Sequence, residues 1–180
     1  MERTAESAER PPSWALPVTV AGGLALVRQP GVLAYLGPVC AYPTGLLFWV
    51  SVSLDPQRLG DRGAGFDAGT RERPPWAPRV QVRFDGMVVD SATRPTGRAA
   101  AGMAVLRSCG WRASGAASPD ARHDSLWWVA PLPREGPVEF AVFLDGVTEH
   151  SGTARIDAGL IVDAARRAMS LWDQPGTGRR

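Results

Sequence analysis

The stretch DSLWWVAPLPREGPVEFAVFLDG, residues 124–146, decides the fold class of this chain. In its second half, every other residue is large and apolar: Val138, Phe140, Val142 and Leu144. Because successive side chains of a strand point to opposite faces, this alternation predicts a strand with one apolar face. Residues 126–130 are bulky without interruption, which is typical of a strand buried on both faces or nearly so.

The connection between these two segments is rich in proline. Pro131, Pro133 and Pro137 cannot donate a backbone hydrogen bond, and each pushes the residue before it toward an extended conformation. Gly136 can adopt the positive φ that a tight corner needs. We therefore expect the two strands to be antiparallel neighbours joined by an irregular turn.

Outside this stretch, the clearest strand signal lies at residues 46–54. One face of this segment carries Leu46, Phe48, Val50, Val52 and Leu54, and the other carries Leu47, Trp49, Ser51 and Ser53. The uncharged residues 31–54 are together long enough to cross a bilayer. Prolines and glycines interrupt them, however, and the alternation favours two successive strands over one membrane helix.

Further strands are predicted at residues 15–20, 24–28, 32–42, 80–84, 87–89, 103–111 and 153–156. The dipeptide Asp85-Gly86 is typical of a hairpin turn. Asp157 is placed to cap a helix of about four turns, whose apolar residues recur at helical spacing up to Trp172. This succession of strands and turn signals predicts a mainly β protein, an antiparallel β-sandwich of about seven or eight strands with one C-terminal α-helix.

The length of 180 residues favours a single domain. We expect a β-sandwich domain at residues 14–172, with disordered tails at residues 1–13 and 173–180. Residues 55–78 form a long segment rich in Gly and Pro, which is either disordered or functional. Its aromatic residues Phe66 and Trp76 are expected to anchor it to the body by ordinary packing. Residues 112–123 predict a second loop.

Composition limits the possible partners and compartment. The net charge is only +2 and the basic residues are scattered, so we expect neither a nucleic-acid nor a membrane partner. All 20 basic residues are arginine, which excludes a lysine Schiff base and a P-loop lysine. Cys40 and Cys109 are interpreted as buried thiols of a cytoplasmic protein, although a single bridge between them stays open.

Sequence motifs for catalysis and metal binding are absent. His123 and His150 stand alone, without the H-x-x-x-H or H-E-x-x-H spacing that indicates zinc, and we interpret both as loop residues. No G-x-S-x-G nucleophile elbow occurs. We therefore predict no catalytic residue, no metal site and no cofactor, and a protein that is not an enzyme. An enzyme would instead bring two of a small set of residues together in a pocket: His123, Asp124, Asp145, Glu149 and His150.

The outer faces of the predicted sheets carry more aromatic residues than solvent-facing sheet surfaces usually do. One of Trp127 and Trp128 must point away from the core, since neighbours in a strand alternate. The residues expected on an interface or ligand face are Trp49, Trp127, Phe143 and Trp172. We expect the C-terminal helix to cover this surface, with a partner protein, a second copy of the chain or a flat ligand such as a sugar ring as alternatives.

Two motifs carry a family resemblance. AYPTG at residues 41–45 precedes an alternating strand, and LWWVAPLPREGPVEFAVF at residues 126–143 precedes a C-terminal helix. In this order they resemble a group of uncharacterised actinobacterial proteins with a YP-T-G strand start, a W-x-x-PLP-x-x-GP corner and a terminal helix. The resemblance covers most of residues 15–172 and implies a compact, soluble, β-rich domain without a catalytic residue to carry over.

The sequence thus favours a non-catalytic interaction or accessory module, which would contact a protein partner or a second copy of itself. The alternative is a domain that binds a small ligand or a carbohydrate through an exposed tryptophan on a sheet face.

Overall fold

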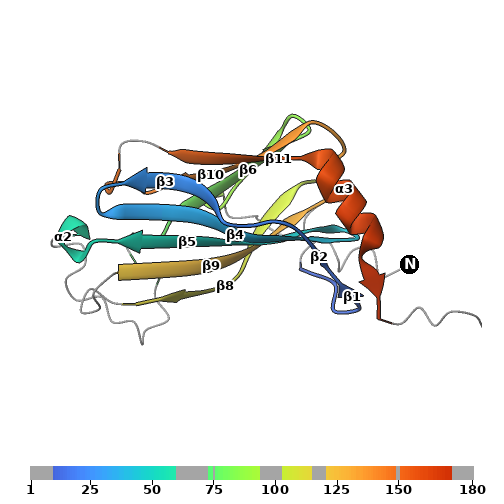
Figure 1. Cartoon of the computed structure of the whole chain (residues 1–180), viewed down its shortest axis with the longest axis horizontal. Coiled ribbons are helices and arrows are strands. Elements are labelled where there is room, and N and C mark those ends of the chain that lie inside the picture. The colour runs from blue at the N-terminus through green and yellow to red at the C-terminus, as the bar shows by residue number, and fades with distance from the viewer. Residues whose placement is uncertain are drawn as a thin grey trace, which may run out of the picture.

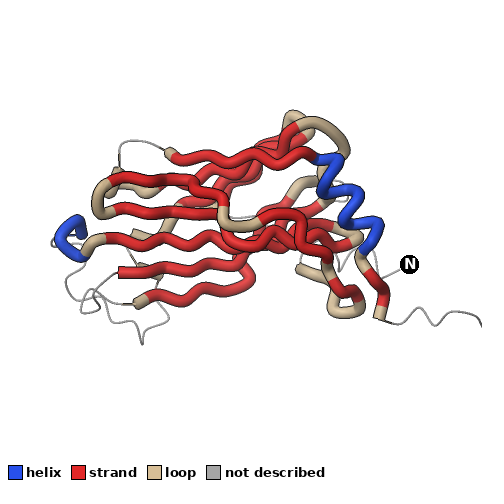
Figure 2. The backbone as a smooth tube through the Cα atoms, viewed as in Figure 1, coloured by secondary structure: helices blue, strands red, loops and turns tan. Residues whose placement is uncertain are grey.

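A computed structural model of the chain describes residues 10–59, 73–74, 76–93, 103–114, 121–148 and 151–171. Two antiparallel sheets pack face to face, and a helix closes one end of the space between them (Figure 1). Strands dominate the backbone (Figure 2), and the prediction of a mainly β sandwich with a helix near the C-terminus is confirmed. The described residues hold strands β1 to β12, two of them only two residues long, rather than about seven or eight.

The first sheet has six strands, in the order β2-β4-β5-β9-β8, with β3 also paired to β4. Its strands are β2 (Val18–Ala21), β3 (Leu24–Gln29), β4 (Val32–Tyr42), β5 (Gly45–Leu54), β8 (Val105–Ala113) and β9 (Ala121–Ala130). The register shifts in β4 between Leu36 and Val39, and in β8 between Ser108 and Gly110, as a β-bulge does. The two strands predicted for residues 31–54 are therefore β4 and β5, and the bulge in β4 contains Gly37 and Pro38, two of the residues that interrupt this segment in the sequence.

The second sheet has four strands, in the order β11-β10-β6-β7. These are β6 (Arg79–Phe84), β7 (Met87–Asp90), β10 (Pro137–Phe143) and β11 (Gly152–Asp157). The hairpin predicted at Asp85-Gly86 joins β6 to β7, and both turn residues have positive φ, 50° and 72°. The alternating residues of β10 bury one face as predicted, because Val138, Phe140 and Val142 are almost fully covered.

The proline-rich corner does not form the predicted hairpin. Strand β9 pairs with β5 and β8, whereas β10 pairs with β6 and β11, so the two strands lie in different sheets. Prolines in the connection remove the donors that a tight hairpin would use, and the chain instead crosses from one layer of the sandwich to the other. The corner therefore joins the two sheets. Phe48 of the first sheet and Phe140 of the second meet edge to face in the core, with ring centroids 5.0 Å apart.

Helix α3 (Ala158–Arg167) begins at Asp157, whose carboxylate accepts a hydrogen bond from the amide of Gly159 at 2.7 Å, as predicted. It ends at Arg167, earlier than expected, and the next residues form β12 (Met169–Ser170), which pairs with β1 (Ala15–Leu16). The buried residues of α3 belong to the main core and contact β2, β4 and β11: Ala158, Ile161, Ala164 and Ala165. The helix closes an end of the sandwich, and the prediction that it covers an aromatic outer face is wrong (Figure 1).

Two smaller predictions concern the loop at residues 55–78 and the cysteines. A short helix, α2 (Pro56–Leu59), follows β5. Trp76 is buried in the main core, so the end of the segment is anchored as expected. Phe66 lies outside the described residues. Cys40 and Cys109 are both free thiols. Cys40 is half-buried but Cys109 is exposed, so the prediction of two buried thiols is wrong for Cys109, which lies at the bulge of the edge strand β8.

Neither helix in the described ranges is long and apolar enough to cross a membrane. The predicted disordered tails, residues 1–13 and 173–180, lie largely outside the described residues.

Candidate functional site

The four residues expected on one interface or ligand face do not come together. Trp49 lies half-buried on the outer face of the six-stranded sheet, and Phe143 lies on the outer face of the four-stranded sheet. Trp127 is only 4% exposed and belongs to the main core, so its predicted place on an outer face is wrong. Trp172 lies outside the described residues.

Strand register explains why Trp127 faces inward. It lies opposite Phe48, a core residue of β5, and partners in an antiparallel pair share a face. Its indole N–H donates to Ser125 Oγ at 2.9 Å, and that hydroxyl donates in turn to the carbonyl of Val50 at 3.3 Å. The polar edge of the indole is therefore satisfied within the core.

Trp128 is the tryptophan that points outward, and yet it is fully buried. Its ring meets Tyr42 edge to face, with centroids 5.6 Å apart, and packs with Leu47 and Val105 in a small cluster outside the main core. Gly45 makes room for it, because a Cβ atom there would lie 2.6 Å from the indole ring. One end of this outer face is thus a second, smaller core.

Trp49 lies in the middle of the same outer face, opposite Leu126 of β9. A glycine stands on either side of this pair: Gly37 in the bulge of β4 and Gly110 in the bulge of β8. A Cβ atom at Gly37 would lie 3.0 Å from the Cβ of Trp49, whereas one at Gly110 would meet nothing within 4 Å. We call Gly37, Trp49, Leu126 and Gly110 the Trp49 row. At both bulges the residue level with this pair is a glycine, which places no side chain beside it.

A row of polar side chains runs beside the Trp49 row across four strands. Its members are in register: Tyr35 of β4, Ser51 of β5, Asp124 of β9 and Arg112 of β8. Ser51 Oγ donates to Asp124 Oδ1 at 2.6 Å, and Arg122 Nε donates to the same oxygen at 3.1 Å. Arg122 Nη2 also donates to the hydroxyl of Tyr35 at 3.2 Å. We call Tyr35, Ser51, Arg112, Arg122 and Asp124 the polar row.

The two rows together offer a ligand an aromatic ring beside fixed donors and acceptors. The carboxylate of Asp124 is only 15% exposed, whereas the Arg122 side chain is 47% exposed. Because the carboxylate is held by two partners, it accepts hydrogen bonds from a fixed position. This combination suits a ligand with one apolar flat side and several hydroxyl groups.

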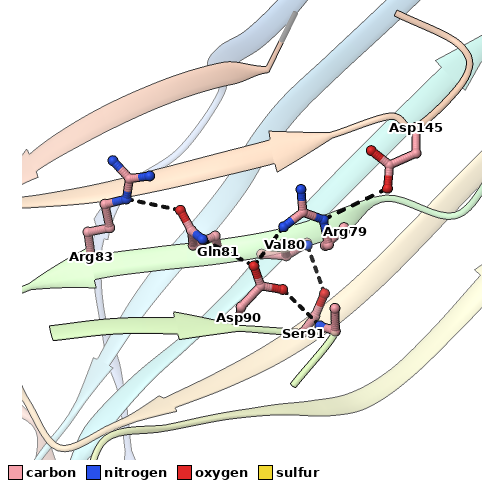
Figure 3. Close-up of polar contacts among 8 residues, drawn as sticks. Arg79, Val80, Gln81, Arg83, Asp90, Ser91 and Asp145 are labelled. Carbon is pink, nitrogen blue, oxygen red and sulfur yellow. Dashed lines mark hydrogen bonds and ion pairs between the residues drawn. The ribbon is translucent and has the colours of Figure 1, made fainter. Parts of the chain in front are cut away.

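The outer face of the four-stranded sheet is built from charged side chains (Figure 3). Asp90 accepts hydrogen bonds from Arg79 at 2.8 Å and Gln81 at 3.1 Å, and Arg83 donates to Gln81 at 2.9 Å. The guanidinium of Arg79 lies 4.0 Å from the ring centre of Phe143. This cation covers Phe143, which therefore offers a ligand little free aromatic surface.

His123, predicted to lie in a loop, belongs to β9 and is fully buried. Its ring stacks on Trp111 with centroids 5.9 Å apart, and among the described residues neither ring nitrogen has a hydrogen-bond partner. Burial, reinforced by the positive charge of Arg73, lowers the pKa of His123 to about 4. Asp124 points to the opposite face of the strand, so these neighbours do not form an acid–base pair.

The other residues of the possible catalytic set do not complete a site either. Asp145 lies at the end of β10 beside Arg79, 3.8 Å away, while Glu149 and His150 lie outside the described residues. Within the described part of the chain, no three His, Cys, Asp or Glu side chains gather in a way that would hold a metal ion.

Sequence reasoning found Trp49 but missed most of the polar row. The alternation of residues 46–54 placed Ser51 on the face of Trp49, which was a usable signal. Arg122 was assigned to a loop, and nothing local indicates that Asp124 lies opposite Ser51, since strand register depends on the whole sheet.

Comparison of the chain with protein-family models, with curated proteins and with solved structures found no match. The resemblance to the actinobacterial group stays a prediction.

Proposed function

We propose that this protein is a non-catalytic binding module that holds a flat, polyhydroxylated ligand, such as a sugar ring, on the Trp49 row. The observation that carries the proposal is the position of Trp49 between two bulged strands and next to the polar row. The apolar side of a sugar ring would lie on the indole, and its hydroxyl groups would reach the carboxylate of Asp124 and the guanidinium of Arg122.

The first expectation, contact with a protein partner through an apolar outer face, has less support at this surface. Most of the exposed large apolar side chains lie in helix α3, in the paired strands β1 and β12, or directly after β12: Leu16, Leu160, Met169 and Leu171. On the outer face of the six-stranded sheet, Leu47 and Trp128 are already packed against each other. Protein interfaces have an apolar centre with a polar rim, whereas here a single tryptophan lies near a mostly buried carboxylate.

Binding to an array of immobilised glycans, followed by calorimetric titration with the best sugar, tests this proposal. We expect Trp49→Ala to weaken binding at least about tenfold, or about 1.4 kcal/mol, because the stacking surface is lost. Asp124→Asn keeps the size of the side chain but removes its charge, and we expect a smaller loss of affinity from it.

Phe143→Ala is the matched control, because it removes an aromatic ring from the other outer face. It should leave sugar affinity within about twofold, well below the tenfold that corresponds to 1.4 kcal/mol. Absence of binding to any glycan by the folded protein would contradict the proposal, as would a Trp49→Ala variant that binds like the parent.

A further inference from the structure

A groove of about 660 Å³ opens on the opposite side of the molecule, on the four-stranded sheet. It lies between the β6–β7 turn and the corner that leads into β10. The residues used below are Arg83, Val88, Pro137, Glu139 and Arg155. Its volume falls in the range of about 300–1,000 Å³ that small-molecule sites occupy.

The two walls of the groove are tied together by Asp85. Its carboxylate accepts a hydrogen bond from the amide of Arg134 at 2.9 Å and another from the amide of Glu135 at 3.3 Å. The same residue has a φ of 50°, so the turn itself is tightly defined. The groove is therefore preformed and does not need to be ordered by a ligand, which lowers the cost of binding.

The floor of the groove holds two guanidinium groups around one carboxylate. Arg155 donates from Nη2 and Nε to Glu139 Oε2 at 2.8 and 2.9 Å, and Arg83 Nη1 lies 3.5 Å from the other oxygen. Arg83 also donates from Nε to Gln81. Each guanidinium has five N–H donors, and these contacts use two on each, so donors remain on both.

The charges of the floor and its apolar wall indicate the kind of ligand. Two cations share one carboxylate, and the side chains of Arg83 and Arg155 are 53% and 70% exposed. The lining also includes the carboxylates of Asp85, which accepts hydrogen bonds from two backbone amides, and of the exposed Glu135. The excess of positive charge is therefore local to the floor and is not a property of the whole groove. Val88, which pairs with Arg83 across the strands, is 56% exposed and forms the apolar side of the groove together with Pro137.

We propose that this groove binds a small organic acid. Its carboxylate would accept hydrogen bonds from Arg83 and Arg155, and its apolar body would lie against Val88 and Pro137. The site is independent of the Trp49 row, because the two lie on the outer faces of different sheets.

The test uses two probes of nearly the same size and shape, one charged and one neutral: 4-phenylbutyrate and its amide. Titration of the full-length protein is followed by amide chemical shifts in NMR at constant ionic strength. We expect the acid to bind with a dissociation constant on the order of 1 mM and to shift the signals of residues 83–88 and 135–139. The uncharged amide should bind at least about fivefold more weakly, because charge-assisted hydrogen bonds are lost.

Variants separate the site from the general charge of the protein. Arg155→Gln keeps a hydrogen-bonding side chain next to Glu139 but removes the positive charge, and we expect it to weaken acid binding at least about fivefold. Val88→Asp should weaken it similarly. Arg166→Ala on α3, which removes an exposed arginine from elsewhere, should change nothing. Equal binding of acid and amide, unchanged binding by Arg155→Gln, or shifts outside the groove would overturn the proposal.

Discussion

The outer faces of the two sheets differ in the side chains that they present to solvent. The four-stranded sheet meets solvent with charged side chains that pair across neighbouring strands, as Arg83, Glu139 and Arg155 do. The six-stranded sheet covers one end of its outer face with a second core around Trp128 and places a mostly buried carboxylate, Asp124, near Trp49. Exposed ion pairs each contribute little to the free energy of unfolding, whereas the packed aromatic residues and the two bulges of the other face fix its side chains in detail.

The sharpest way to break this comparison is to remove one aromatic ring from each outer face. Trp128 is fully buried, so we expect Trp128→Ala to lower the free energy of unfolding by about 3–5 kcal/mol, as a large-to-small substitution in a core does. Phe143 is half-buried beneath Arg79, and Phe143→Ala should cost only about 1 kcal/mol. Urea denaturation measures both; equal costs would show that the faces do not differ in packing.

The difference between the faces also explains how far the sequence could be interpreted. Alternation at residues 46–54 and 138–144 predicted which side chains of β5 and β10 form the core, since burial of every second residue is a local property of a strand. The partner of a strand is not a local property. The corner after Ala130 has the residues of a turn whether the next strand returns to the same sheet or crosses to the other, so the predicted hairpin was wrong.

The same limit applies to the candidate site. Trp127 and Trp128 are neighbours of equal size, and only the pairing of Trp127 with Phe48 decides which one faces the core. The glycines that flank Trp49 and Leu126 lie in bulges of two strands that are distant in sequence, β4 and β8. Only the β4 irregularity had a sequence signal, the Gly37-Pro38 dipeptide.

His123 and Asp124 extend the comparison to the two sides of one strand. With an ordinary pKa of 6.5 when unfolded and about 4 when folded, His123 is protonated first in the unfolded chain. Stability should therefore be complete above about pH 6.5 and fall as the pH drops toward 4, by roughly 3 kcal/mol for this residue. The acidic residues of the outer faces add their own losses in the lower part of this range, so a reference variant is needed.

Denaturation of the parent and of His123→Phe between pH 7.5 and 4 isolates the histidine, since the replacement ring stays neutral. We expect the difference between the two curves to grow as the pH falls below about 6.5. If the unfolding free energies of the two proteins changed in parallel over the whole pH range, the pKa of His123 would not be lowered by folding, and the prediction would be wrong.

The smallest expected effect compares one polar contact on each face. Ser51 is 5% exposed and donates to Asp124 at 2.6 Å, so Ser51→Ala leaves a mostly buried carboxylate with one donor fewer and should cost about 1 kcal/mol at any salt concentration. Arg155 is 70% exposed, and Arg155→Ala should cost less than about 1 kcal/mol, with a contribution that shrinks further in high salt. Urea denaturation at low and high sodium chloride separates the two. If the serine contact were as sensitive to salt as the arginine contact, the polar row would be solvated, and Trp49 would lie on an ordinary surface.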